Sequence, residues 1–374
     1  MRKPAARTGS DLKVHKREIE FSFWPVCPGP GGGVTNSKLF ATDPWPVIVG
    51  AVERRCPKNS MQAALAFVEQ AHHFYKAAGA TAVAAAKPVL LYYYFMNLAK
   101  ALVLTEKIQK CLDEAQHGLS EQPQTGAVTV QSAYLKARPS TPLGKPSVFD
   151  EFLRAIQRKG LPAKTTFNLP VLLTQVVPGH RLLLSASGGR ERFIAVESIR
   201  MLDGGRNEIW LRLCIREGDL SRAGVTQKAL LEQSRLGAAW QGVDDNNAGT
   251  VCLEQSETVQ YQPGYIANNI PQLVASLTPH LWQTVTSWPP YRKYYIYLAT
   301  HADKPCVLPQ LLSVYAIMFY LSSITRYRPH RFDEILASAH GPFIQAFLND
   351  QPSQFLFLMA SEFAKREVAR AALI

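Results

Sequence analysis

One short stretch of the sequence gathers several side chains that can bind phosphate. Residues 326–331 read Arg-Tyr-Arg-Pro-His-Arg. Guanidinium groups bind phosphate oxygens bidentately, and a tyrosine ring can stack on a nucleobase. A histidine beside them offers a general acid or base. This stretch supplies a first set of candidate nucleic-acid-binding residues, Arg326, Tyr327, Arg328 and Arg331, and a candidate catalytic residue, His330.

The same stretch also has a structural interpretation. Pro329 must end the helix before it, because the residue that precedes a proline avoids helical geometry. Arg326 and Arg328 then lie at a helix carboxyl terminus, where cations interact favourably with the last carbonyl groups. Asp333 and Glu334 follow closely and offer carboxylates for ion pairs. The sequence leaves the structural and the functional interpretation both open.

A second group of candidates lies on and after a long apolar stretch. Asn97 and Lys100 are three residues apart, so they share one helix face. Burying an unpaired amide or ammonium group is costly, so both either face a ligand or bond to neighbouring groups. His117 precedes Gly118, and we expect the two to cap the carboxyl terminus of this helix. His117 is also a second candidate for general acid or base.

The sequence contains no recognisable metal or cofactor motif. Six cysteines are widely spaced, without a CxxC pair or the His/Cys spacing of a zinc site. The adjacent His72 and His73 point in different directions from one helix. Residues 244–247, Asp-Asp-Asn-Asn, are typical of a solvated loop. We therefore expect no metal, no cofactor, and free thiols in a reducing compartment.

The charge balance favours an acidic partner. The chain has 41 Lys and Arg against 29 Asp and Glu, a net charge of +12. Such a surface attracts polyanions, so nucleic acid, either RNA or DNA, is the first candidate and an acidic partner protein the second. The charge is equally compatible with a role in solubility alone. Residues 1–17 are basic and show no apolar pattern, so we expect them to aid binding without supporting the core.

The apolar stretches do not predict a membrane span. Residues 88–104 are short for a span and include Asn97 and Lys100, and residues 311–324 are shorter still. The sequence opens on polar and charged residues without an apolar signal segment. We expect a cytoplasmic protein that has no membrane contact, and an oligomer is compatible with the sequence.

Hydropathy patterns divide the chain into four parts. Apolar residues recur every three or four positions in two helical blocks, with helices expected over 60–77, 89–111 and 149–158 and over 311–324, 332–339 and 354–372. Pro352 suits the first turn of the last helix. Residues 116–147 are expected to be a connecting loop. Strands are expected over 192–202, 208–216, 250–261 and 294–299, and the first two are expected to form a hairpin. The expected parts are a basic tail and irregular arm (1–57), an amino-terminal helical block (58–160), a β-rich middle (161–306) and a carboxy-terminal helical block (307–374).

The strands cluster in the sequence and do not alternate with helices, which indicates the α+β class. The expected architecture is mainly helical, with two helical blocks packed together around a shared core. The β-rich middle is expected to be an insert between them.

The helical segments resemble a known family. The amino-terminal segments FVEQAHHFYKAA, LLYYYFMNLAKALVL and HGL, and the carboxy-terminal segments FYLSSITRYRPHRFDEIL and QFLFLMASEFAKREVA, resemble the YaaC-like protein family. The helical parts are also similar, at greater distance, to HEPN-type bundles. Many of those cleave RNA or belong to antiphage defence, and their signature is an Arg separated from a His by four to six residues. Arg326 and His330 have three residues between them and so depart from it.

The leading hypothesis is a non-enzymatic or weakly enzymatic protein that binds nucleic acid or a partner protein. The resemblance implies a component of a bacterial defence or stress module. One alternative is a metal-independent RNA-cleaving effector that uses His117 or His330, and another is a protein–protein scaffold. Convergence of His117, Lys100 and the 326–330 stretch in one cleft would favour cleavage. Use of these side chains in helix ends and internal ion pairs would favour binding.

Overall fold

The chain folds as an α+β protein that divides into two compact units. The computed structural model describes residues 3–27, 33–81, 85–122, 130–141, 144–177, 179–245, 247–285, 293–300 and 307–371 of 374. Each unit combines segments that are distant in the sequence. The sheet unit contains Met1–Phe40, Arg190–Lys304 and Lys365–Arg370, and the helical unit contains Ala41–Gly189, Pro305–Ala364 and Ala371–Ile374.

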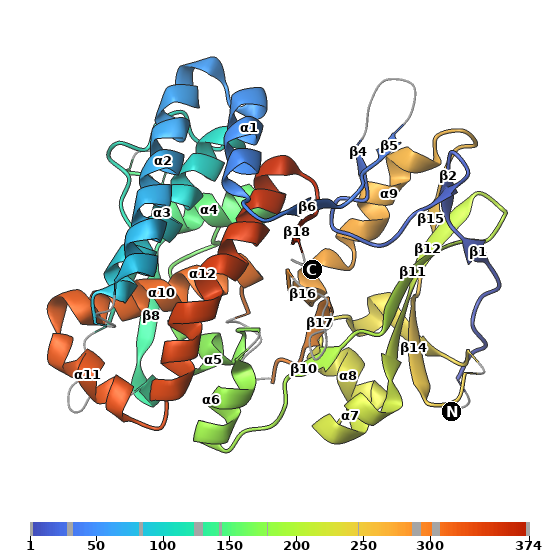
Figure 1. Cartoon of the computed structure of the whole chain (residues 1–374). Coiled ribbons are helices and arrows are strands. Elements are labelled where there is room, and N and C mark those ends of the chain that lie inside the picture. Colours follow the sequence, from blue (N-terminus) through green and yellow to red (C-terminus); the bar gives the residue numbers. More distant parts are fainter. Residues whose placement is uncertain are drawn as a thin grey trace. The chain divides into compact units, whose positions relative to one another are not determined.

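The helical unit is built around two apolar helices. Its helices are α1 (Trp45–Arg55), α2 (Lys58–Ala80), α3 (Lys87–Thr105), α4 (Val148–Gln157), α5 (Leu169–Thr174), α6 (His180–Ser187), α10 (Gln310–Tyr327), α11 (Pro329–Ala337) and α12 (Gly341–Ala364). Helix α3 contacts α2, α4, α10 and α12 (Figure 1). Both α3 and α10 are apolar on nearly every side, because neighbours surround them.

Aromatic rings join the helices of this core. The ring of Phe95 in α3 stacks on Phe355 in α12 at 3.9 Å between centroids. The ring of Tyr92, also in α3, meets Tyr315 in α10 edge-on at 5.8 Å. Helix α3 is the one described helix long and apolar enough to cross a membrane, and 78% of its apolar window is buried in the protein. Such burial is typical of a core helix.

A small antiparallel sheet completes the helical unit. Strand β8 (Tyr134–Ala137) pairs with β7 (Leu119–Glu121) on one side and with β9 (Thr165–Asn168) on the other. The expectation of a connecting loop over residues 116–147 is therefore wrong for the segments that form β7 and β8. Strands of three and four residues with few β-branched side chains give little sequence signal.

The sheet unit is centred on a twisted antiparallel sheet in the order β1-β11-β12-β14-β13, with β15 also paired to β12 (Figure 1). The sheet unit also contains three short helices, α7 (Glu217–Ala223), α8 (Gln227–Gln233) and α9 (Ile266–Ala275). The strands of the unit are β1 (Ser10–Asp11), β2 (Lys13–Val14), β3 (Arg17–Glu18), β4 (Val26–Cys27), β5 (Val34–Thr35), β6 (Leu39–Ala41), β10 (Phe193–Ala195), β11 (Ser198–Asp203), β12 (Glu208–Arg216), β13 (Trp240–Val243), β14 (Thr250–Gln255), β15 (Val259–Gln260), β16 (Leu281–Gln283), β17 (Tyr294–Tyr297) and β18 (Val368–Arg370).

The hairpin expected from the sequence is present. Strands β11 and β12 pair antiparallel from Ser198 opposite Cys214 to Asp203 opposite Ile209. Gly205 and Asn207 in the turn adopt positive φ angles of 71° and 59°. Glycine and asparagine tolerate this backbone geometry, so the turn residues predicted the hairpin correctly.

The first residues of the chain are part of the sheet unit and not a free tail. Leu12 and Val14 are 1% and 3% exposed and belong to the unit's core cluster. The guanidinium group of Arg7 donates to the carbonyl oxygen of Gln255 at 2.8 Å. The expectation that residues 1–17 contribute nothing to the core is therefore wrong. Strands of two residues are too short to show an apolar alternation in the sequence.

The last helix is longer at its start and shorter at its end than expected. Helix α12 runs from Gly341 to Ala364, and Pro352 lies inside it. The expected start at 354 with a first-turn proline is therefore wrong. After Ala364, Val368–Arg370 form β18, which pairs with β6.

Two of the cysteines are bonded, which corrects the expectation of free thiols. Cys214 and Cys252 lie opposite each other on β12 and β14 and form a disulfide. Cys27, Cys56 and Cys111 are free. Cys306 lies outside the described residues.

Candidate functional site

His117 lies at the junction between α3 and the small sheet. Helix α3 ends at Thr105, so the expected capping of this helix by His117 and Gly118 is wrong. Gly118 does adopt a positive φ, 78°, but uses it to turn the chain into β7. A Cβ atom there would lie 1.8 Å from the hydroxyl oxygen of Ser147. The chain at His117 is thus held tightly against the start of α4.

The imidazole of His117 is held by a tyrosine of the core. Its Nδ1 atom lies 2.7 Å from the hydroxyl oxygen of Tyr92 in α3. That hydroxyl lies 3.5 Å from the hydroxyl of Tyr315 in α10. Burial raises the pKa of Tyr92 well above its ordinary value, so its hydroxyl stays protonated at neutral pH. A protonated hydroxyl can donate to Nδ1 of a neutral imidazole.

Two cations accompany this pair. The guanidinium carbon of Arg326 lies 5.7 Å from the ring centroid of Tyr92 and 5.2 Å from that of Tyr327. Burial, then the charge of Arg326 and then that of Lys100 lower the pKa of His117 below its ordinary value of 6.5. Burial likewise lowers the pKa of Lys100. His117 therefore interacts electrostatically with two other candidate residues, Lys100 and Arg326.

The other candidates of the 326–331 stretch have separate environments. Arg328 forms an ion pair with Glu121, a carboxylate whose side chain is 7% exposed and also accepts from Ser323 at 3.1 Å. Arg331 pairs with Glu334 three residues later, at 2.8 Å. His330 is exposed in the first turn of α11.

The ring of Tyr327 is 72% exposed at the end of α10. Asn97 is 2% exposed, and its side-chain amide donates to the side-chain oxygen of Gln70 in α2 at 2.8 Å. This bond joins two helices, which matches the structural alternative for Asn97.

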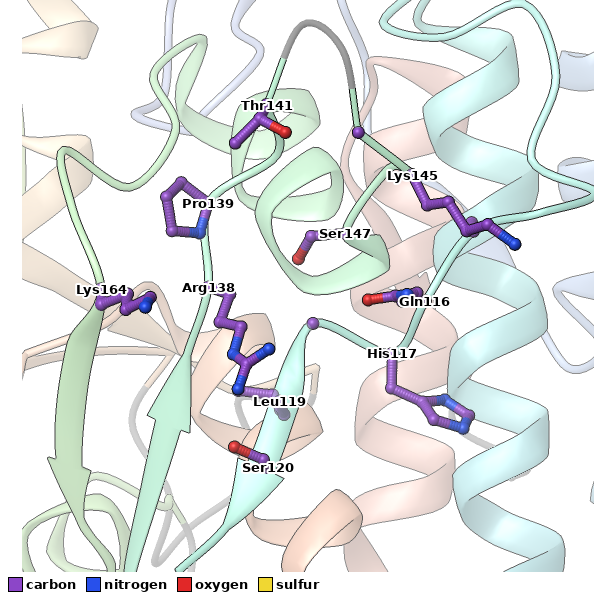
Figure 2. Close-up of a pocket in the computed structure, with 13 residues that line it drawn as sticks. Gln116, His117, Leu119, Ser120, Arg138, Pro139, Thr141, Lys145, Ser147 and Lys164 are labelled. Atoms are coloured by element: carbon purple, nitrogen blue, oxygen red, sulfur yellow. The ribbon is translucent and has the colours of Figure 1, made fainter.

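A cavity of about 670 Å³ lies beside His117. Figure 2 shows the labelled side chains around it: Arg138, Pro139 and Lys164 lie on one side and Gln116, His117 and Lys145 on the other. We call it the His117 pocket. Its lining residues are Ala115, Gln116, His117, Gly118, Leu119, Ser120, Arg138, Pro139, Thr141, Gly144, Lys145, Ser147 and Lys164. None of these residues is acidic, and four are basic or histidine.

Strand pairing brings the two best-placed cations together. Arg138 follows the last residue of β8 and Lys164 precedes the first residue of β9. Ala137 and Thr165 are paired across these antiparallel strands, so Arg138 and Lys164 leave the sheet at the same end. The backbone N–H of Arg138 also donates to the carbonyl oxygen of Gly118 at 2.9 Å. The pocket is therefore built on the sheet edge and on the turn at Gly118.

The pocket cations differ in their partners. Lys145 pairs with Glu114 at 3.4 Å, but both side chains are more than half exposed. Within the described part of the chain, Arg138 and Lys164 form no ion pair. Sequence reasoning missed Arg138, Lys145 and Lys164, because their proximity depends on β7 and β8, which lie in the expected loop over 116–147, and on β9, for which no strand was expected. Their only sequence signal is a set of separate basic residues without an acidic neighbour.

The described residues do not place a metal centre at this site. Among them, one group of three, Cys214, Asp245 and Cys252 of the sheet unit, has ligand atoms close enough to hold a metal ion. Two of the three are joined in the disulfide. Asp245 also pairs with Arg212 at 2.9 Å. This group is better described as part of an internal network.

The fold and the pocket together define an α+β protein whose helical unit has a cavity lined by basic side chains. The family model described as YaaC-like Protein matches residues 37–363, so the chain belongs to the YaaC-like family. This confirms the resemblance of the helical segments. No curated protein and no solved structure matches the chain.

Proposed function

We propose that this protein binds nucleic acid at the His117 pocket. The observation that carries the proposal is the lining of the pocket, in which Arg138, Lys145, Lys164 and His117 occur without an acidic residue. Arg138 and Lys164, which form no ion pair among the described residues, are available for phosphate oxygens. The net charge of +12 adds a general attraction for a polyanion.

Each pocket cation has a distinct part in this proposal. Arg138 can hold one phosphate group through two parallel N–H donors. Lys164 contributes a point charge from the neighbouring strand end. The exposed pair between Lys145 and Glu114 is weak in water, so Lys145 can exchange its partner at little cost.

The test is the binding of a labelled single-stranded RNA measured by fluorescence anisotropy over a range of salt concentrations. We expect affinity to fall steeply with salt, because bound phosphates release counterions. The variant R138Q/K164Q should bind more weakly and lower the salt slope by about 1 for each phosphate that the protein no longer neutralises. Lys136→Gln is the matched control, because Lys136 is exposed on β8 but does not line the pocket.

Three outcomes would overturn the proposal. Wild-type protein that does not bind RNA or single-stranded DNA at low salt has no such function. Binding that persists unchanged in the double variant places the nucleic acid elsewhere. If poly-glutamate binds in a pocket-dependent manner and nucleic acid does not, the partner is an acidic protein.

RNA cleavage is a second candidate, and the electrostatic interaction of His117 with both Arg326 and Lys100 favours it. In the tautomer that donates its Nδ1–H to the hydroxyl oxygen of Tyr92, the free Nε2 of His117 can take the proton of a ribose 2′-hydroxyl, and nearby cations can stabilise the charge that develops on the phosphorus oxygens. His117 would then take, from another element, the place of the histidine in the Arg–His signature of HEPN-type bundles. The proposed relationship of this chain to HEPN-type bundles is part of this proposal of RNA cleavage.

Cleavage is tested with an end-labelled RNA and two histidine variants. We expect His117→Ala to abolish cleavage and His330→Ala to leave it unchanged, because His117 and not His330 adjoins Arg326 through Tyr92. The opposite result would assign the role of general acid or base to His330. Absence of cleavage by the wild type would reject the enzyme while leaving the binding proposal intact.

The wider role is also a proposal. Cytoplasmic location and membership of a bacterial defence or stress module rest on the sequence and on the distant resemblance to HEPN-type bundles. The alternative role is a protein–protein scaffold whose apolar helices bury a partner surface, with the two helical blocks packed together around a shared core and the β-rich middle inserted between them. The genes next to this one would test the module directly.

A further inference from the structure

We propose that the His117 pocket binds a phosphate monoester at the end of a nucleic-acid strand, and not a diester within it. This inference rests on the proposed function and names the part of the strand that the pocket recognises. The same chemistry occurs in small phosphorylated metabolites, and the experiment below separates the two sources.

The charge of the pocket favours a monoester. Arg138, Lys145 and Lys164 supply three cations to one cavity of about 670 Å³. A backbone diester carries one negative charge, whereas a monoester carries about 1.5 to 2 at neutral pH. A dianion therefore interacts with the three cations more strongly than one diester group does.

The shape of the lining favours the phosphate and sugar over the base. Among the described residues that line the pocket there is no Phe, Tyr or Trp, and the largest apolar side chains are Leu119 and Pro139. A nucleobase normally stacks on an aromatic ring or an arginine plane when a protein binds a single strand, and the one arginine among the described lining residues, Arg138, is assigned to phosphate in this proposal. The hydroxyl groups of Ser120, Thr141 and Ser147 instead suit phosphate and ribose oxygens.

The start of helix α4 leaves anion binding to side chains. Its first N–H groups are already used: Val148 donates to the carbonyl of Gln116 at 2.8 Å and Phe149 to that of His117 at 3.3 Å. Asp150 donates to the hydroxyl oxygen of Ser147 at 3.3 Å. The charge of an anion in the pocket is therefore balanced by the basic side chains and not by the first N–H groups of α4, so substitution of these side chains should have a clear effect.

The experiment compares one RNA sequence carrying a 5′-phosphate, a 3′-phosphate or hydroxyl groups at both ends. We expect one of the phosphorylated strands to bind about tenfold more tightly than the hydroxyl strand. Arg138→Gln should remove this preference while retaining part of the affinity for all three strands. Lys136→Gln should retain the preference.

Equal binding of all three strands by the wild type would overturn end recognition while leaving nucleic-acid binding intact. No binding of any strand would instead overturn the proposed function itself. Competition by ribose 5-phosphate or inorganic phosphate identifies the other source. If ribose 5-phosphate and inorganic phosphate displace a phosphorylated strand no better than sulfate does, the result supports recognition of the terminal phosphate as part of a nucleic-acid strand. If ribose 5-phosphate binds to the pocket while the end phosphate adds nothing to RNA affinity, the ligand is a small metabolite and the proposal is wrong.

Discussion

His117 combines a hydrogen bond to the core with a neighbourhood of positive charge. Burial, Arg326 and Lys100 all disfavour its protonated form, so the pKa of His117 lies below 6.5 in the folded protein. The ordinary value applies when the chain unfolds. As the pH falls through the ordinary pKa of histidine, His117 becomes protonated in the unfolded chain but stays neutral in the folded chain, which favours unfolding. His117 therefore makes the fold less stable on the acidic side.

We predict that His117→Gln reduces the loss of thermal stability between about pH 7.5 and pH 5.5. Glutamine keeps an acceptor for the hydroxyl of Tyr92 and does not titrate. The measurement is the unfolding midpoint at both pH values, with His330→Gln as the control for an exposed histidine. Identical pH dependence in wild type and His117→Gln would contradict this account.

The two arginines at the end of α10 should differ in their effect on stability. Arg328→Ala leaves the buried carboxylate of Glu121 without its cation, and we expect a loss of about 2 kcal/mol. Arg326→Ala removes a ring contact and a hydrogen bond to the carbonyl of Ser322, and we expect no more than about 1 kcal/mol. Chemical denaturation measures both changes.

A double variant supplies the control for this comparison. Glu121→Gln combined with Arg328→Ala removes the unpaired charge and should recover part of the loss. A cost for Arg326→Ala equal to that for Arg328→Ala would mean that Arg326 has a structural role as well. Its selection as a binding residue would then lose support.

At this scale the sequence predicted some site residues and missed others for a definable reason. Arg326 and Lys100 were selected because their types stand out in or beside apolar helices. Arg138 and Lys164 are 26 positions apart in the numbering and become neighbours only when β8 pairs with β9. No local pattern encodes that pairing, so a single sequence does not reveal this pocket.

At the scale of elements, Gly118 determines how β7 approaches α4. We predict that Gly118→Ala costs roughly 1–3 kcal/mol more than Gly205→Ala in the hairpin. The two glycines have φ angles of 78° and 71°, so a side chain strains the backbone similarly at both. Only at Gly118 would a Cβ meet Ser147, because nothing lies within 4 Å at Gly205.

Denaturant unfolding of both variants measures the difference, and RNA binding by Gly118→Ala shows whether the pocket is disturbed. Equal costs would mean that Ser147 moves aside without penalty. The approach of β7 to α4 would then be less tight than the geometry indicates.

Elements with strong local signals were predicted well, and those held by distant contacts were not. The hairpin of β11 and β12 and helices α2, α3, α4 and α10 follow from turn residues and apolar periodicity. Helix α12 was placed wrongly because Pro352 suggested a start, whereas its carbonyl accepts a hydrogen bond from the hydroxyl of Tyr94 in the middle of the helix. Packing against α3 overrides the local preference of proline here.

At the scale of the whole molecule, the first residues are required for the sheet unit. We predict that deletion of residues 1–17 destabilises this unit by about 3–5 kcal/mol, because Leu12 and Val14 lose their burial. The deletion also removes Arg7 and its hydrogen bond to Gln255. The control is Lys3→Gln/Lys16→Gln, which removes charge from exposed positions and should keep the fold.

Thermal unfolding of the two proteins separates the contributions of charge and of apolar contact. A deletion variant as stable as the wild type would show that β1 and β2 are dispensable. Weaker RNA binding by the double lysine variant alone would support a contribution of the amino-terminal charge to the partner interaction.

The division of each unit among distant segments affects how the chain folds during synthesis. The carboxylate of Glu367 pairs with Lys293 at 2.6 Å, and its carbonyl oxygen accepts from the N–H of Leu39 at 2.8 Å. The sheet unit therefore cannot complete its fold until its carboxy-terminal segment leaves the ribosome, on the order of half a minute after its first strands. The helical unit likewise waits for α10 and α12. If synthesis stalls before the carboxy-terminal segments emerge, both units have incomplete cores and expose apolar surface that chaperones can bind. Neither unit can bury this surface by folding before the other.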